Sequence, residues 1–383
     1  MRERLSRDFE RFGRGMPADF AAVVRDEYRI DLTARYLGRP VPHPIGKGSG
    51  QLSLNLDQLE ADRAAGLAFV VLKTVVGQNP AGHQAMAAWA VHETRMKVER
   101  RRAISGREGW TVTWKGRGWD RSFEEYLDLV HAAGALTRDG WLAVPSVKLH
   151  LPMLGQPFDD EEYRFTVRGV AEAWGGDSLA LEQDFSPTLA GDALADEQER
   201  ILRWLREAPA TIRAAAAPRP VTLALKLMNA RYDDQFQVGM LAAAGGADAL
   251  VVFNRLWSAE QGVAYGGYDL SDRNLRVLAA ARARGLALPP LCGTGNVCSG
   301  RLILDYARVG CESVQLHTFF QLPLGEYPAT AGTRTERALH ALVFHPEDGL
   351  LAGLLALEER GELHRDGGEL RFLDLCASRA EGR

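Results

Sequence analysis

The sequence predicts an α/β protein whose eight strand–helix units close into a (β/α)8 TIM barrel. Short apolar runs alternate with longer amphipathic ones along most of the chain, and this alternation is typical of parallel βα units. Several apolar runs, such as residues 247–253, show little internal alternation, as strands buried on both faces do. Because no long linker interrupts the series, we favour a closed barrel over an open, doubly wound sheet.

Each predicted strand is a short apolar run that follows a turn signal. The strands are expected at residues 44–46, 68–73, 143–149, 178–183, 221–227, 247–253, 288–293 and 313–318. Helices are expected at 54–65, 123–133, 161–173, 196–214, 237–244, 272–283 and 301–309. Glycines that end helices support several of these boundaries, at Gly66, Gly175, Gly246, Gly285 and Gly310.

Two stretches lie outside the barrel, which is expected to span residues 36–345. Residues 1–35 form an N-terminal helical extension in which Leu5, Phe9, Phe12 and other apolar side chains recur every three or four positions. One or two helices docked on the barrel are expected there, and helices on a membrane surface or a quinone channel are the alternatives. Residues 346–383 are expected to form a C-terminal helix and tail.

Composition excludes several classes of protein. The 383 residues are 46% hydrophobic, enough for a large core, and the formal net charge of −4 gives no reason to expect a nucleic-acid partner. The four cysteines lack C-x-x-C spacing, so neither a disulfide framework nor a cysteine zinc site is expected, and a reducing cytoplasm fits best. No apolar run is long enough for a transmembrane helix, and no metal site is predicted.

Loops after the last two predicted strands carry the strongest site signal. Residues 292–300 read Cys-Gly-Thr-Gly-Asn-Val-Cys-Ser-Gly and open a helix. Glycines let backbone N–H groups approach an anion, and the helix N-terminus adds its dipole. With Thr318 at the end of strand eight, Gly295 and Asn296 predict a phosphate site; a plain tight turn is the alternative.

The ordered set of strand-end segments resembles the FMN-binding face of dihydroorotate dehydrogenases. The matching segments are Gly48-Ser49-Gly50, Lys73-Thr74, Asn79-Pro80, Leu225-Lys226-Leu227, Asn254, Gly266-Gly267, Gly293–Val297 and Val314–Thr318. The resemblance runs from about residue 30 to 325 and implies FMN as the cofactor. It implies that FMN contacts Gly48, Ser49, Lys73, Thr74, Gln183, Lys226, Asn254, Gly267, Gly295, Asn296, His317 and Thr318.

The chemistry of a flavin explains two of these residue types. A reduced flavin carries negative charge near N1 and C2=O, which a buried lysine such as Lys226 or Lys73 stabilises. A lone lysine at a strand end is more often solvated. The segment at 181–188, Leu-Glu-Gln-Asp-Phe-Ser-Pro-Thr, resembles the family's catalytic segment and implies that Ser186 is the base. Without the resemblance, Ser-Pro is simply a turn signal.

The substrate end departs from the family. Thr188 stands where the family has an asparagine, Arg255 follows Asn254 where a serine or threonine is usual, and no asparagine occurs in residues 111–118. The candidate substrate residues are Asn79, Thr188, Asn254 and Arg255. The departures from the family predict an altered substrate site, because a site that pairs amides loses affinity when its partners change. Trp110, with the tryptophans and cations near it, either lines a pocket for an anionic or aromatic molecule or folds on its own loop.

These observations predict an FMN-dependent oxidoreductase that transfers hydride between flavin N5 and a small cyclic amide-like or imide-like molecule. The alternatives are dihydroorotate dehydrogenase itself and a barrel that binds flavin or phosphate without redox chemistry. The resemblance also implies a homodimer.

Overall fold

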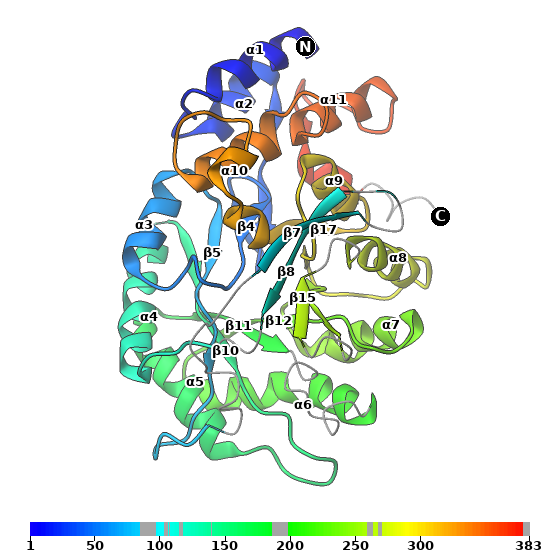
Figure 1. The fold of residues 1–383 in the computed structure, drawn as a ribbon. Coiled ribbons are helices and arrows are strands. Elements are labelled where there is room, and N and C mark those ends of the chain that lie inside the picture. Colours follow the sequence, from blue (N-terminus) through cyan, green and yellow to red (C-terminus); the bar gives the residue numbers. More distant parts are fainter. Residues whose placement is uncertain are drawn as a thin grey trace.

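Helices surround a curved parallel sheet in the computed structural model of the chain (Figure 1). The structure describes residues 1–84, 97–102, 106, 108–114, 118–138, 140–185, 198–258, 263–266 and 270–377. The sheet has ten strands in the order β6-β10-β11-β12-β13-β16-β17-β4-β5-β9. These strands are β4 (Ile45–Lys47), β5 (Phe69–Val71), β6 (Val75–Val76), β9 (Leu142–Val144), β10 (Ser146–Lys148), β11 (Leu179–Phe185), β12 (Val221–Leu227), β13 (Ala249–Val252), β16 (Leu291–Gly293) and β17 (Cys311–Leu316).

The α/β class is confirmed, and the sheet is barrel-like. It is a ten-stranded half-barrel, however, and not the closed eight-stranded barrel that the sequence predicts. One expected strand, 143–149, is divided by Pro145 into β9 and β10. A further strand, β6, lies beyond the expected strand 68–73 and is separated from β5 by residues 72–74. Proline has no N–H group for the ladder, and the amides of Leu72 and Lys73 instead donate to the carbonyls of Val144 and Ser53.

The helices of the βα units lie on the outer face of the sheet. They are α3 (Leu56–Ala64), α4 (Phe123–Arg138), α5 (Asp160–Trp174), α6 (Gln198–Ala216), α7 (Asp234–Ala243), α8 (Leu270–Ala283) and α9 (Gly300–Arg308). Side chains of Asn55, Asp159, Asp233 and Ser299 accept hydrogen bonds from the first turns of α3, α5, α7 and α9. Such N-caps fix where a helix begins, and therefore where the loop before it ends.

The N-terminal and C-terminal segments pack on each other. Helices α1 (Arg2–Phe12) and α2 (Phe20–Tyr28) lie beside α10 (Arg334–Phe344) and α11 (Leu350–Glu359) (Figure 1). Strand β1 (Ile30–Asp31) pairs in parallel with β18 (Leu370–Arg371), which leads into α12 (Phe372–Ala377). The phenyl rings of Phe12 and Phe344 meet edge to face with centroids 4.8 Å apart. The amphipathic pattern of residues 1–35 is thus explained by burial against the C-terminal helices.

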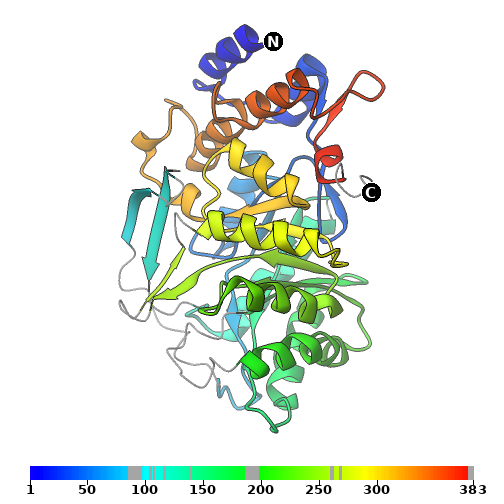
Figure 2. The same cartoon turned by 90° about the vertical axis from the view of Figure 1, so that its right-hand side faces the viewer.

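A second, antiparallel sheet projects from one end of the first (Figure 2). It comprises β14 (Leu256–Ser258), β15 (Val263–Gly266), β8 (Glu108–Trp114) and β7 (Lys97–Arg102), in that order. The sequence pattern predicts loops after the strands in this part of the chain. The backbone N–H of Trp110 donates to Asn296 Oδ1 at 3.2 Å, which fastens β8 to the predicted phosphate loop.

A small hairpin packs against the inner side of the first sheet. Strands β2 (Ala34–Tyr36) and β3 (Arg39–Val41) place the Tyr36 ring on Phe69, with centroids 4.0 Å apart and planes 9° apart. A side chain at Gly46 would overlap Phe69, since an added Cβ would lie 2.2 Å from its ring. In the described part of the chain, no helix combines the length and apolar character that a membrane crossing requires.

Candidate functional site

A cavity opens at the carboxyl ends of the parallel strands, with about 750 Å³ of empty space including its mouth. Three chain segments, 48–51, 294–298 and 315–319, form much of its wall, and Trp110 contributes from β8. The predicted site residues that line it are Gly48, Ser49, Lys73, Lys226, Asn254, Arg255, Gly295, Asn296, His317 and Thr318. In α/β proteins with parallel strands, ligands commonly bind at this end of the strands.

The other predicted residues are placed differently. Thr74 lies directly behind Ser49, with the two hydroxyl oxygens 2.7 Å apart. Gln183 lies away from the cavity, where its amide donates to the Asp184 carbonyl, and Asn79 Oδ1 caps a turn by accepting from the Ala81 and His83 amides. Ser186, Thr188 and Gly267 lie outside the described residues.

The placement of Gln183 follows from the two-residue period of a strand. Glu182 and Asp184 lie on one face of β11, and Gln183 lies on the other. The carboxylate of Glu182 lies beside Lys226, so the acidic residues face the inside of the sheet. Gln183 therefore lies on the face opposite Glu182, and the residues that line the cavity do not include it.

The loop after β16 has the geometry of an anion cradle. Gly295 has φ +96°, and an added Cβ would lie 2.7 Å from the Phe253 carbonyl oxygen, so only glycine fits without strain. Within the described residues, the Gly295 amide donates to no protein carbonyl. The amides of Thr318 and Phe319 open a short 3-10 helix (Thr318–Gln321), and the first N–H groups of a helix have no carbonyl partner within it. Amides of this kind on two adjacent loops can bind phosphate oxygens.

A buried amide network supports this loop from below. Asn274 on α8 donates through Nδ2 to the carbonyls of Phe253 and Thr294, at 2.9 and 2.8 Å. Its Oδ1 accepts from Asn229 Nδ2 at 3.1 Å, and Tyr306 Oη donates to the Thr294 carbonyl at 2.7 Å. These residues are not among the predicted site residues, although an asparagine on the apolar stripe of a predicted helix is a usable signal.

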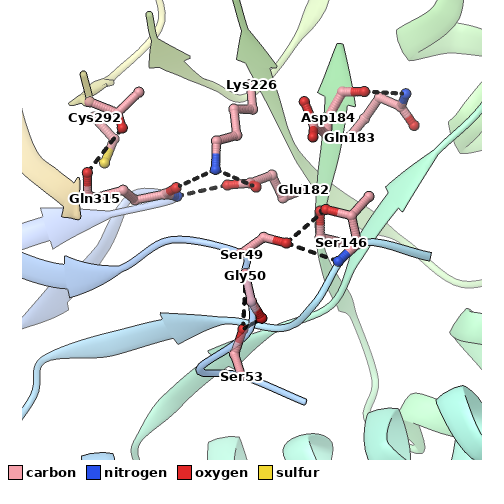
Figure 3. Close-up of polar contacts among 12 residues, drawn as sticks. Ser49, Gly50, Ser53, Ser146, Glu182, Gln183, Asp184, Lys226, Cys292 and Gln315 are labelled. Atoms are coloured by element: carbon pink, nitrogen blue, oxygen red, sulfur yellow. Dashed lines mark hydrogen bonds and ion pairs between the residues drawn. The ribbon is translucent and has the colours of Figure 1, made fainter. Parts of the chain in front are cut away.

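Beneath the cavity, Lys226 belongs to a network of buried polar side chains (Figure 3). Its Nζ donates to Gln315 Oε1 at 3.1 Å and lies 3.5 Å from Glu182 Oε1. Glu182 Oε2 accepts from Gln315 Nε2 at 2.7 Å and from Tyr36 Oη at 3.2 Å. Sequence reasoning missed Glu182, whose signal is a carboxylate inside an otherwise apolar strand.

His317 presents a neutral imidazole. Burial lowers its pKa well below the ordinary value, and the nearby cations Lys73 and Lys47 lower it further. Its Nε2 is buried and has no hydrogen-bond partner among the described residues. The ring lies against Gly50, where an added Cβ would come within 1.9 Å of Nε2. A neutral imidazole without a partner can donate to or accept from a ligand.

Lys148, at the end of β10, is another buried lysine near these strands. Burial lowers its pKa to about 8, while the charge of Asp184 raises it and that of Arg255 lowers it. A group with a pKa near neutrality can take up or release a proton during turnover.

The described residues contain no group of three or more histidine, cysteine or acidic side chains arranged to hold a metal ion. No model of a known protein family matches the chain, and no curated protein matches it at a significant level.

Proposed function

We propose that the protein is an FMN-dependent oxidoreductase of the dihydroorotate dehydrogenase kind. The observation that carries the proposal is one cavity that combines two loops of available amides with the ammonium groups of Lys73 and Lys226. A phosphorylated, electron-accepting cofactor needs both features, the amides for its phosphate and the cations for its reduced ring.

We also propose that the ten segments of the parallel sheet correspond to the eight strands that the sequence predicts. In this interpretation, one interrupted strand consists of β5 and β6, and another consists of β9 and β10. The strand pairing supports this interpretation, because β5 pairs with β9 and β6 pairs with β10. Both segments of one interrupted strand therefore pair with the segments of the other. The amides of Gly295 and Thr318 then follow the seventh and eighth strands, β16 and β17, and barrels commonly bind phosphate after these two strands.

The residues present fit FMN. The orphaned Nε2 of His317 and the unbonded loop amides are polar groups that a ligand would satisfy. Gly48 leaves the space over Lys226 open, since an added Cβ would lie 3.4 Å from Nζ. When bound, FMN supplies the hydride acceptor or donor. Lys226 then binds the electron-rich edge of the ring, and Lys73 lines the same cavity.

For the substrate, we propose a small cyclic amide-like or imide-like molecule. Asn254 and Arg255 line the cavity and would contact it, and Arg255 favours a substrate that carries negative charge. Ser186 is the proposed base. Asn79 and Thr188 are kept as proposed substrate residues, although Asn79 lies away from the cavity described above.

The test is reconstitution of the purified protein with FMN. We expect stoichiometric binding, measured by quenching of flavin fluorescence, and bleaching of the bound flavin by one member of a set of cyclic amides and imides. Bleaching by dihydroorotate would identify a dihydroorotate dehydrogenase. Binding without bleaching by any reductant would favour a non-redox flavin protein, and failure to bind FMN would refute the proposal.

A further inference from the structure

Glu182 is a buried carboxylate in the middle of the parallel sheet, and none of its side chain is exposed. Its strand, β11, pairs with β10 on one side and with β12 on the other. A carboxylate in such a place costs several kcal/mol of desolvation, which its neighbours must offset. Replacing a buried ion pair with apolar residues is often neutral or stabilising, so stability alone does not account for a glutamate here.

The neighbours of Glu182 form a chain that ends at Lys226 (Figure 3). A carboxylate only accepts hydrogen bonds, so the side of Gln315 that faces Glu182 must be its NH₂ group. The Gln315 carbonyl oxygen is thereby turned toward Lys226 Nζ, 3.1 Å away. Glu182 therefore affects Lys226 in two ways. Its Oε1 lies 3.5 Å from Lys226 Nζ, and its carboxylate fixes the orientation of Gln315.

Tyr36 holds Glu182 from the other side. Burial raises the pKa of Tyr36 well above its usual value, and the negative charge of Glu182 adds to this effect. The phenol therefore stays protonated and donates to Glu182 Oε2 at 3.2 Å. The stacking of Tyr36 on Phe69 fixes the position of this donor.

Lys226 has a further direction open to a ligand. An ammonium has three N–H groups, and Gln315 and Glu182 lie near two of them. Lys226 also lines the cavity beside Gly48, which has no side chain to obstruct an approaching group.

We propose that Glu182 is a positioning residue that holds the Lys226 ammonium below the cavity and limits how strongly it attracts an electron-rich ligand. This inference rests on the proposed function, in which that ligand is the edge of FMN. The buried negative charge opposes part of the attraction of Lys226 for the reduced, anionic ring. Glu182 therefore lowers the preference of the site for reduced over oxidised FMN.

The direct test compares Glu182→Gln with the native protein. The substitution removes one negative charge, keeps the size of the side chain and leaves an oxygen that can accept from Gln315. We expect the ratio of affinities for reduced and oxidised FMN to rise about tenfold, a shift of about 30 mV in a two-electron potential. The measurement is a spectroscopic redox titration of the bound flavin.

The matched control is Asp62→Asn. Asp62 also forms a buried ion pair with a lysine, Lys47, but on the outer side of the sheet against Thr335. This control loses a buried carboxylate without changing the charge beside Lys226. A potential that moves equally in both variants, or in neither, would overturn the inference.

A second measurement works without flavin. Urea unfolding of Glu182→Gln, Lys226→Met and the double variant forms a double-mutant cycle. We expect the double variant to be less destabilised than the sum of the two single variants, because each single variant disrupts the same pair. Additive effects would overturn the inference even if FMN binds.

These experiments separate the two proposals. If the native protein does not bind FMN, the proposed function fails and the unfolding cycle alone decides the role of Glu182. If Glu182→Gln does not fold, Glu182→Asp draws the carboxylate back from Lys226 by one methylene. We then expect a smaller change of the same sign, and an unchanged potential would count against Glu182.

Discussion

At the scale of single residues, Gly295 carries the shape of the loop that we propose to bind phosphate. Its φ of +96° disfavours any L side chain, and an added Cβ would lie 2.6 Å from Asn274 Nδ2 and 2.7 Å from the Phe253 carbonyl oxygen. The second contact is with backbone, which cannot move aside as the end of a flexible side chain can.

Gly295→Ala is therefore expected to destabilise the protein by about 2 kcal/mol or more and to weaken FMN binding at least tenfold. Urea unfolding and flavin fluorescence measure the two effects. The control is Gly239→Ala inside α7, where an added Cβ meets nothing within 4 Å; it should stabilise the protein by up to about 1 kcal/mol. Equal behaviour of the two variants would contradict the assigned role of the loop.

His43 couples stability to pH. Its Nδ1 accepts from the Ile45 amide at 3.2 Å, and its Nε2 lies 2.8 Å from the Gly66 carbonyl oxygen, an arrangement that requires a neutral ring. Burial lowers its pKa from 6.5 to about 4. Between pH 4 and 6.5 the ring binds a proton in the unfolded chain but stays neutral in the folded protein. The stabilisation that the neutral ring gives the folded protein is therefore complete above pH 6.5 and is lost as the pH falls toward 4.

Acid unfolding measures this contribution, which amounts to about 3 kcal/mol. His43→Gln should remove that part of the pH dependence between pH 4 and 6.5. His131→Gln, at an exposed position of α4, should keep it. A native protein whose stability is flat over this range would show that the His43 ring titrates normally.

Single residues also show where sequence reasoning succeeds and fails. Lys73 and Lys226, which the resemblance selects, both line the cavity, although a lone lysine at a strand end is more often solvated. Gln183 is predicted from the resemblance of residues 181–188 to a family segment, and in a strand a shift of one residue reverses the face. The sequence does contain the better signal, the two acids Glu182 and Asp184 two positions apart.

At the scale of elements, the strands of the parallel sheet are predictable and the second sheet is not. A buried strand such as β13 is a continuous apolar run, whereas β7 reads Lys-Val-Glu-Arg-Arg-Arg and resembles a polar loop. Strand β15 pairs with β8, about 150 residues earlier in the chain, and no local pattern encodes such a partner.

Asn296 is where the second sheet meets the proposed phosphate loop. Its φ of +52° suits glycine, so Asn296→Gly keeps the backbone and removes the acceptor for the Trp110 amide. Losing one hydrogen bond worth about 1 kcal/mol should speed hydrogen exchange at the Trp110 amide about fivefold. Asn296→Asp keeps an acceptor oxygen and should leave exchange unchanged. Equal exchange in all three proteins would mean that other contacts hold β8.

At the scale of the whole molecule, the extensions at the two ends of the chain form one layer. Helix α1 contacts α10 and α11, and β1 pairs with β18. The sequence predicts residues 1–35 and 346–383 as separate additions to the barrel, because each is read from its own local pattern. Their mutual contact is a long-range feature that amphipathic spacing alone does not specify. The cytoplasmic location and the homodimer stay predictions.

The contact between these extensions predicts that they unfold together with the parallel sheet. Phe12 is 6% exposed and packs on Phe344, so Phe12→Ala should cost about 3 kcal/mol. All eight tryptophans lie beyond residue 35, and tryptophan fluorescence therefore reports unfolding of the rest of the molecule. A lower urea midpoint by this probe would show one cooperative unit, since the substitution is remote from every reporter.

The control for this experiment is Leu154→Ala, which removes a side chain that is 39% exposed and should change stability by less than about 0.5 kcal/mol. If Phe12→Ala instead leaves the tryptophan transition in place and alters only the far-ultraviolet circular dichroism, the helices of residues 1–35 unfold on their own. That result would favour the separate extension that the sequence predicts, because a shared core transmits the loss of one large side chain to the whole unit.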